Sequence, residues 1–145
     1  LEDKLGICGY VLGTKDTKKF FKKMIEEWLP KYQNRFPMPG GDPESWNLDQ
    51  KIAALIHNPR VSIPDTLNNF PAHLHIDLLT RARKKGNGRR MIETLHMKLK
   101  NLGIKGVFLD VGIKNFNAQS FYEKIGYKKL QVTPSKDGVF MINQL

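Results

Sequence analysis

The stretch RARKKGNGRR, residues 81–90, decides how this sequence folds. Six of its ten residues are cationic, and it contains the triplet Gly86-Asn87-Gly88. A strand-like run that ends at Leu79 precedes it, and an amphipathic run follows it, so the order is strand, basic glycine loop and helix start. Glycines let backbone N–H groups approach an anion closely, and a helix N-terminus carries partial positive charge. The stretch therefore predicts a phosphate-binding loop.

Length and composition set the outer limits. The chain has 145 residues, of which 40% are hydrophobic, enough for one domain with a core of its own. The 24 Lys and Arg against 14 Asp and Glu give a net charge of +10, which attracts a nucleotide cofactor, nucleic acid, an acidic protein or an anionic membrane. A single Cys8 excludes an intrachain disulfide, and no apolar run is long enough for a membrane span. We expect a reducing compartment, cytoplasmic or nuclear, and no membrane partner.

Periodicity and turn signals predict alternating strands and helices. We expect a short helix after Asn47, which forms a capping-box-like start with Gln50. From Ala72 the pattern has period two, with the apolar side chains on one face and His73, His75 and Asp77 on the other. Strands are expected at 7–12, 72–79, 107–111, 127–132 and 139–141, helices at 20–30, 47–56, 92–102 and 118–125, and turns at 36–46 and 134–138. The fold class is α/β, a β-α-β-α core followed by a terminal hairpin.

Two motifs carry a resemblance to a known family. Residues 83–88, RKKGNG, satisfy the R/Q-x-x-G-x-G/A loop by which GNAT acetyltransferases hold the pyrophosphate of acetyl-coenzyme A. One helix and one strand further on, residues 115–127 resemble the second GNAT signature, N-x-x-A-x-x-F-Y-x-x-x-G-F/Y. The resemblance implies the GNAT (acyl-CoA N-acyltransferase) fold, a central mixed sheet flanked by helices, with acetyl-CoA as the cofactor and no metal.

Further stretches resemble the acetyltransferase-like domain at the C-terminus of O-GlcNAcase and its bacterial relatives. They are residues 8–14, 20–30, 36–37 and 70–77, so nearly the whole chain takes part. The resemblance implies a single GNAT-like domain over residues 1–145 that lacks the first strand and first helices of the fold. It also implies a parent chain with glycoside hydrolase and stalk domains, and a homodimer. The intact glycine loop differs from vertebrate forms, in which this loop is degraded.

The resemblance also implies roles for individual residues. The expected cofactor-binding residues are Leu78 and Leu79 through their backbone, the loop residues Arg83, Lys84, Lys85, Gly86, Asn87, Gly88 and Arg89, and Asn115. Tyr122 matches the position of the acid that protonates the departing thiolate, and its alternative role is a core aromatic beside Phe121. Asp77 is the expected base, with a helix cap or an ion pair as the alternative, and Asp110 is the second choice of base.

Three function classes remain. The resemblance implies a pseudo-acetyltransferase module of an O-GlcNAcase, serving in dimerisation or protein recruitment with retained acetyl-CoA affinity; the alternative is an active N-acetyltransferase. Nucleic-acid binding ranks last, because the cations cluster at one loop and the aromatic residues recur at core spacing. The H-x-H-x-D pattern at His73, His75 and Asp77 has the spacing of metal ligands, but no fourth ligand is in view, and hydrogen-bonded histidines explain it more simply.

Overall fold

The computed structural model describes residues 1–59, 61–130 and 138–145. The chain forms two compact units: residues 1–17 together with 63–145, and residues 18–62. The first unit contains the β-sheet and the glycine loop, and the second is helical. No helix in the described part of the chain is long and apolar enough to cross a bilayer.

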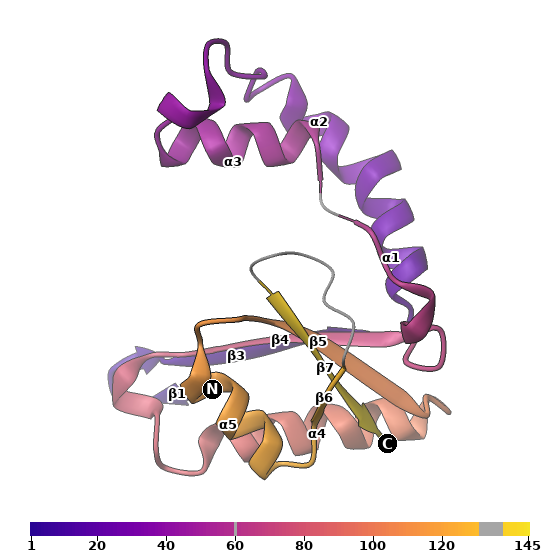
Figure 1. Ribbon diagram of the computed structural model, residues 1–145. Coiled ribbons are helices and arrows are strands. Elements are labelled where there is room, and N and C mark those ends of the chain that lie inside the picture. The colour runs from indigo at the N-terminus through magenta and orange to yellow at the C-terminus, as the bar shows by residue number, and fades with distance from the viewer. Residues whose placement is uncertain (60, 131–137) are drawn as a thin grey trace. The chain divides into compact units, whose positions relative to one another are not determined.

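A five-stranded mixed sheet organises the first unit (Figure 1). In spatial order its strands are β3 (Gly9–Thr14), β4 (Ala72–Leu78), β5 (Gly106–Gly112), β7 (Gly138–Gln144) and β6 (Lys128–Lys129). Only β4 and β5 run parallel, and every other pair is antiparallel. A small hairpin of β1 (Glu2–Asp3) and β2 (Gly6–Ile7) precedes β3, so the run expected as one strand over residues 7–12 is divided between β2 and β3.

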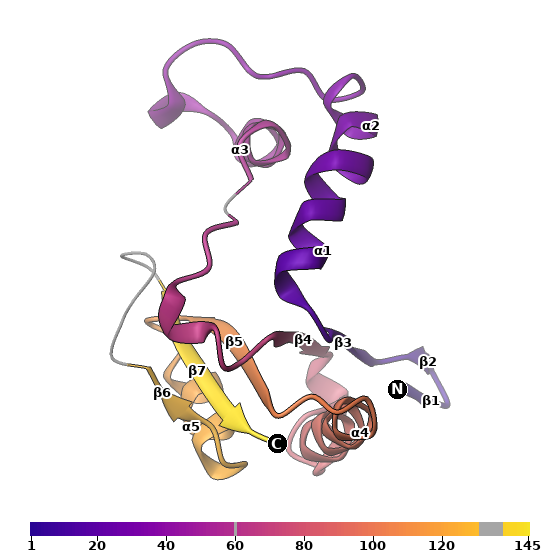
Figure 2. The same ribbon diagram turned by 90° about the vertical axis from the view of Figure 1, so that its right-hand side faces the viewer.

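Two helices cover one face of this sheet. Figures 1 and 2 both show α4 (Asn87–Asn101) and α5 (Phe116–Lys124) on the same side of the strands. The buried cluster beneath them draws apolar side chains from β4, β5, β7 and both helices, together with Tyr127 between α5 and β6: Ala72, Leu74, Ile92, Leu99, Val107, Leu109, Val111, Tyr122, Tyr127, Val139 and Met141. A smaller cluster of Leu67, Phe108 and Phe140 lies on the opposite face, beside the 3-10 turn Asp65–Leu67.

Strand β4 explains why the two faces differ. Its apolar alternate residues Ala72, Leu74 and Ile76 pack in or against the large cluster, as the period of two predicts. The other alternate residues, His73, His75 and Asp77, therefore point to the face opposite α4 and α5. Phe108 pairs with His73, so its side chain lies on this same face. Asp110, two residues further along β5, lies on this face as well.

The helical unit contains α1 (Thr17–Lys23) except its first residue, a π-helical turn (Met24–Trp28), α2 (Leu29–Gln33), a 3-10 turn (Pro43–Ser45) and α3 (Leu48–His57). The expected end of the first helix at Pro30 is wrong, because the helical path continues to Gln33. Pro30 follows the π-helical turn directly, in which the Leu29 N–H donates to the Met24 carbonyl oxygen, and its ring, which has no N–H to donate, stands in the first turn of α2. The capping box of Asn47 and Gln50 is confirmed, with both bonds at 2.9 Å.

The C-terminal part of the sheet is described only in part. The strand expected at 127–132 is observed as β6, Lys128–Lys129, and β7 is longer than the expected strand at 139–141. Residues 131–132, and residues 134–137 of the expected turn, lie outside the described residues.

Candidate functional site

The glycine loop joins β4 to α4 through a 3-10 turn at Thr80–Ala82. Gly86 is the N-cap of α4 and adopts the left-handed conformation with φ 75°, and Lys84 is left-handed as well, with φ 58°. The side-chain amide of Asn87 donates through Nδ2 to the Ala82 carbonyl oxygen (2.9 Å) and closes the loop. No side chain caps the N-terminus of α4, so the N–H groups of its first turn remain available to an anion.

The two glycines of the loop serve different needs. A side chain at Gly86 would meet no atom within 4 Å, so glycine is favoured there by its backbone conformation. At Gly88 an added Cβ would lie 3.1 Å from Cζ of Phe121 and 3.4 Å from Cδ1 of Leu78. Gly88 therefore lets the first turn of α4 pack closely against α5 and the end of β4.

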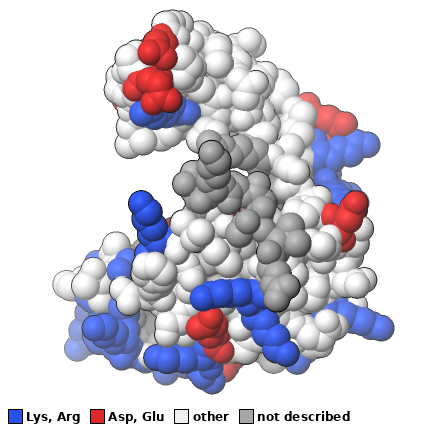
Figure 3. Space-filling model, viewed as in Figure 1, with Lys and Arg blue, Asp and Glu red and all other residues white. Residues whose placement is uncertain are grey.

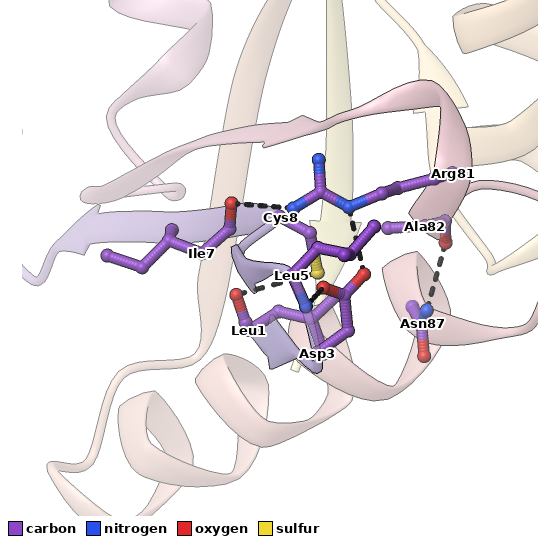
Figure 4. A network of polar contacts seen from close by, with 8 residues as sticks. All are labelled: Leu1, Asp3, Leu5, Ile7, Cys8, Arg81, Ala82 and Asn87. Carbon is purple, nitrogen blue, oxygen red and sulfur yellow. Dashed lines mark hydrogen bonds and ion pairs between the residues drawn. The ribbon is translucent and has the colours of Figure 1, made fainter.

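Most cations of the loop are engaged in local structure. Arg81 donates to the Asp3 carboxylate (2.9 Å) and to the Ile7 carbonyl oxygen (3.2 Å), which ties the β1–β2 hairpin to the loop (Figure 4). Arg89 donates to the Lys124 carbonyl oxygen (3.0 Å) at the end of α5, and Arg90 donates to the Asn87 side chain.

Three cations remain oriented toward solvent or the strand end. Arg83 donates through Nε to the carbonyl oxygen of Leu78 (2.7 Å), which fixes the loop to the last residue of β4. Lys84 and Lys85 are exposed, and the described residues offer neither of them an acceptor. Lys84 and Lys85 are therefore the cations of this loop that a bound anion can recruit without breaking an existing contact.

The sheet opens beside this loop. Strands β4 and β5 pair only at Ala72 with Val107 and at His73 with Phe108, although β4 pairs with β3 from His73 to Leu78, and β5 pairs with β7 over its whole length. Beyond His73 and Phe108 the two strands are not paired with each other, and we call this region the β4–β5 opening. Both strands lead from it into the N-terminal ends of helices, β4 into α4 and β5 into α5.

The register decides which backbone groups of β4 face the opening. The Leu79 N–H donates to the Cys8 carbonyl oxygen (2.9 Å), and the Leu79 carbonyl accepts from the Ala82 N–H (2.9 Å). Antiparallel bonding alternates along the chain, so Asp77 bonds toward β3, whereas Ile76 and Leu78 point their N–H and C=O groups toward β5. At the opening, Ile76 thus presents its N–H and C=O and Leu78 its N–H, whereas the Leu78 carbonyl oxygen already accepts from Arg83 and both backbone groups of Leu79 are bonded. Ile76 was not among the residues expected at the site, because a period of two in the sequence does not show which strand each residue bonds.

Tyr122 lies in α5 and is 8% exposed, with its ring against Phe121 and Tyr127. Its hydroxyl has no hydrogen-bond partner among the described residues, and no buried polar side-chain atom there is left unsatisfied, so the hydroxyl oxygen reaches solvent. Burial, and then the negative charge of Asp77, raise the pKa of Tyr122 to about 12. Tyr122 therefore carries its proton at neutral pH, and the field of Asp77 reaches it.

The two candidate bases have opposite pKa shifts. Hydrogen bonds from Tyr10 and His75 lower the pKa of Asp77 below its ordinary value. Burial raises the pKa of Asp110, whose carboxylate lies over Gly138 so closely that a side chain there would overlap it. Asp110 is therefore the stronger proton acceptor of the two.

The second motif holds the start of α5 in place. The Asn115 side chain accepts from the Ala118 N–H (3.2 Å) as the N-cap of α5. Gln119, buried in the same helix, donates to the carbonyl oxygens of Gly112 (3.0 Å) and Ile113 (2.9 Å). Gln119 was not among the expected site residues, although it stands inside the motif.

The histidines of the H-x-H-x-D pattern are hydrogen-bonded. His73 Nδ1 lies 2.9 Å from the Thr17 hydroxyl, and His75 Nε2 lies 3.0 Å from Asp77. No group of three or more His, Cys, Asp or Glu residues in the described ranges is arranged to hold a metal ion.

Comparisons with known proteins agree with this geometry. The model of the acetyltransferase (GNAT) family matches residues 21–127. Protein O-GlcNAcase of Rattus norvegicus and that of Mus musculus are each 35% identical over 127 residues, which is 87% of this chain and 14% of theirs. The chain thus spans about one seventh of the length of these relatives.

Solved structures have the same fold. The crystal structure of a protein named SsHAT is 35% identical with a TM-score of 0.87, and the match covers 99% of this chain and 70% of that one. A crystal structure of an acetyltransferase matches at 20% identity with a TM-score of 0.61, over 99% of this chain and 67% of that one, which is a likeness of fold alone. From the family match and the related structures, the chain belongs to the acetyltransferase (GNAT) family.

Proposed function

We propose that the chain binds acetyl-coenzyme A at the glycine loop and the β4–β5 opening, and transfers the acetyl group to an amine. The observation that carries this proposal is the uncapped N-terminus of α4, which begins at a left-handed Gly86 and follows the part of β4 that no longer pairs with β5. An anion at the helix N-terminus and an extended chain along the unpaired strand edges satisfy both sets of free backbone groups.

The residues present fit this cofactor. The first-turn N–H groups of α4, with Lys84 and Lys85, would hold the pyrophosphate, and the backbone of Ile76 and Leu78 would bond the pantetheine amides. The bound cofactor supplies an activated acetyl thioester. Tyr122, protonated at neutral pH, would donate its proton to the thiolate leaving group, and Asp110 would accept a proton from the amine.

Isothermal titration of acetyl-coenzyme A into the protein tests the proposal. We expect micromolar binding that Gly86→Asp weakens at least about tenfold, because the new carboxylate would occupy the helix N-terminus and repel the pyrophosphate. Gly103→Asp is the matched control, since Gly103 also has a left-handed φ of 76° and open space around it, but follows the other end of α4. Absence of binding heat in folded wild-type protein, or equal weakening in both variants, would contradict the proposal.

A second candidate function is the pseudo-acetyltransferase module of an O-GlcNAcase, acting in dimerisation or protein recruitment within a parent chain that carries glycoside hydrolase and stalk domains. The similarity to O-GlcNAcase over 87% of the chain supports it, as does β3, which lies at the edge of the sheet. Acetyl transfer that is lost in Tyr122→Phe contradicts the pseudoenzyme, and a monomeric mass in analytical ultracentrifugation contradicts the homodimer.

A further inference from the structure

Three polar side chains from β3 and β4 form a cluster on the sheet face opposite α4 and α5. The Tyr10 hydroxyl donates to Oδ2 of Asp77 (2.6 Å), and Nε2 of His75 lies 3.0 Å from the same oxygen. The rings of Tyr10 and His75 are 6.0 Å apart between centroids and inclined by 31°. The other carboxylate oxygen of Asp77, Oδ1, has no partner among the described residues.

The register of the sheet holds this cluster together. Tyr10 stands directly opposite Asp77, and His75 precedes Asp77 by two residues on the same strand face. The cluster is nevertheless open to solvent, since the side chains of His75 and Asp77 are 65% and 62% exposed. Two donors thus fix one oxygen of an accessible carboxylate and leave the other oxygen available to a ligand.

The cluster lies beside the β4–β5 opening. His75 and Asp77 belong to the part of β4 that no longer pairs with β5, and Asp110 stands on the same face of β5 beyond the last paired residue, Phe108. In a chain with a net charge of +10, two carboxylates therefore flank this opening, while the cations gather at the loop that follows β4. A cationic ligand is therefore attracted to the β4–β5 opening, and an anionic ligand to the glycine loop.

We propose that Tyr10, His75 and Asp77 form the subsite that binds the acceptor as a primary aliphatic ammonium ion. Oδ1 of Asp77 accepts an N–H of the ammonium group, and the two aromatic rings lie beside the cation. The proposal rests on the function proposed above and gives Asp77 a binding role, while Asp110 accepts the proton. It selects aliphatic amines that are charged at neutral pH over alcohols of the same size.

The protons balance in this scheme. The ammonium ion loses one proton to Asp110, and the nitrogen lone pair forms the C–N bond to the acetyl carbonyl carbon. Tyr122 would give its proton to the thiolate that leaves as the C–S bond breaks. The Tyr122 phenolate then recovers the second proton from nitrogen, and Asp110 releases its proton to water.

Nuclear magnetic resonance titration with n-butylammonium, in the absence of coenzyme, tests the subsite. We expect millimolar binding at low ionic strength that perturbs the resonances of Tyr10, His75 and Asp77. Asp77→Asn should weaken it at least about tenfold, and Tyr10→Phe, which keeps the ring, only a few-fold. Asp49→Asn, which removes the same charge from exposed α3, is the matched control, and 1-butanol is the neutral probe.

Three results would contradict the subsite. They are unchanged resonances at tens of millimolar n-butylammonium, binding to Asp77→Asn as tight as to the wild type, and shifts with 1-butanol as large as those with n-butylammonium. Acetyl-coenzyme A titration of the same samples separates the two proposals, because Asp77→Asn should bind it as the wild type does. Ammonium binding without coenzyme binding supports the subsite and contradicts the proposed function. In acetyl transfer to n-butylamine, Asp77→Asn should raise KM for the amine more than it lowers kcat.

Discussion

The two buried tyrosines, Tyr122 and Tyr127, have different roles although their rings are in contact. The Tyr127 hydroxyl lies 2.7 Å from Nε2 of His96, whereas the Tyr122 hydroxyl reaches solvent. Tyr127→Phe should therefore lower the free energy of unfolding by about 1–3 kcal/mol and leave kcat nearly unchanged. Tyr122→Phe should do the reverse, changing stability by less than about 0.5 kcal/mol and lowering kcat about 100-fold. Urea unfolding and acetyl transfer to n-butylamine measure both, and a large stability loss in Tyr122→Phe would contradict the assignment.

The pair of Tyr10 and Asp77 predicts a reciprocal change of two pKa values. Their hydrogen bond lowers the pKa of Asp77 and raises that of Tyr10. Tyr10→Phe should return the pKa of Asp77 toward its ordinary value, and Asp77→Asn should lower the pKa of Tyr10 toward 10.0. Because the pKa of Asp77 is depressed in the folded state, its contribution to stability is present above its unfolded pKa and is lost as the pH falls through the folded pKa. Carboxyl and ring NMR titrations measure the shifts, with Tyr32→Phe as the control that leaves Asp77 unchanged.

The connection from β5 to α5 depends on a buried side-chain amide, that of Gln119. Gln119 is 4% exposed and bonds the carbonyl oxygens of Gly112 and Ile113, which fixes the start of α5 against the end of β5. Gln119→Leu keeps the volume but removes both donors, so it should lower the free energy of unfolding by about 1–3 kcal/mol. Asn117→Ala, an exposed change in the same helix, should stay within about 0.5 kcal/mol. Equal urea midpoints for the two variants would show that the amide is not required.

Some features of the helices and strands could be predicted from the sequence, and others could not. The period of two in β4, the capping box at Asn47 and the loop glycines were predictable, because each depends on local spacing or on one backbone conformation. The β4–β5 opening was not, since it depends on which strands pair and where pairing stops. The cluster of Tyr10 with Asp77 was missed for the same reason, because 67 residues separate the two in the chain.

Two features of the whole molecule attract an anion: its net positive charge and the local geometry of the glycine loop. Lys and Arg side chains gather along the side of the sheet unit that α4 and α5 cover (Figure 3), so long-range attraction acts on any polyanion. Long-range attraction depends on total charge and is screened within about 10 Å at 0.1 M salt. The loop acts instead through Lys84, Lys85 and fixed backbone N–H groups, which screening affects less.

Two charge-matched double variants separate these effects. The first variant combines Lys84→Gln with Lys85→Gln, and the second combines Lys31→Gln with Lys51→Gln. Each removes two positive charges from a net charge of +10, but only the first changes the glycine loop. We expect the first pair to weaken acetyl-coenzyme A binding about tenfold in isothermal titration and the second to change it less than about twofold at 0.1 M salt. Raising the salt should reduce wild-type affinity only several-fold, because uncharged N–H donors of α4 provide part of the binding. Equal weakening by both pairs would mean that net charge, and not the loop, attracts the cofactor.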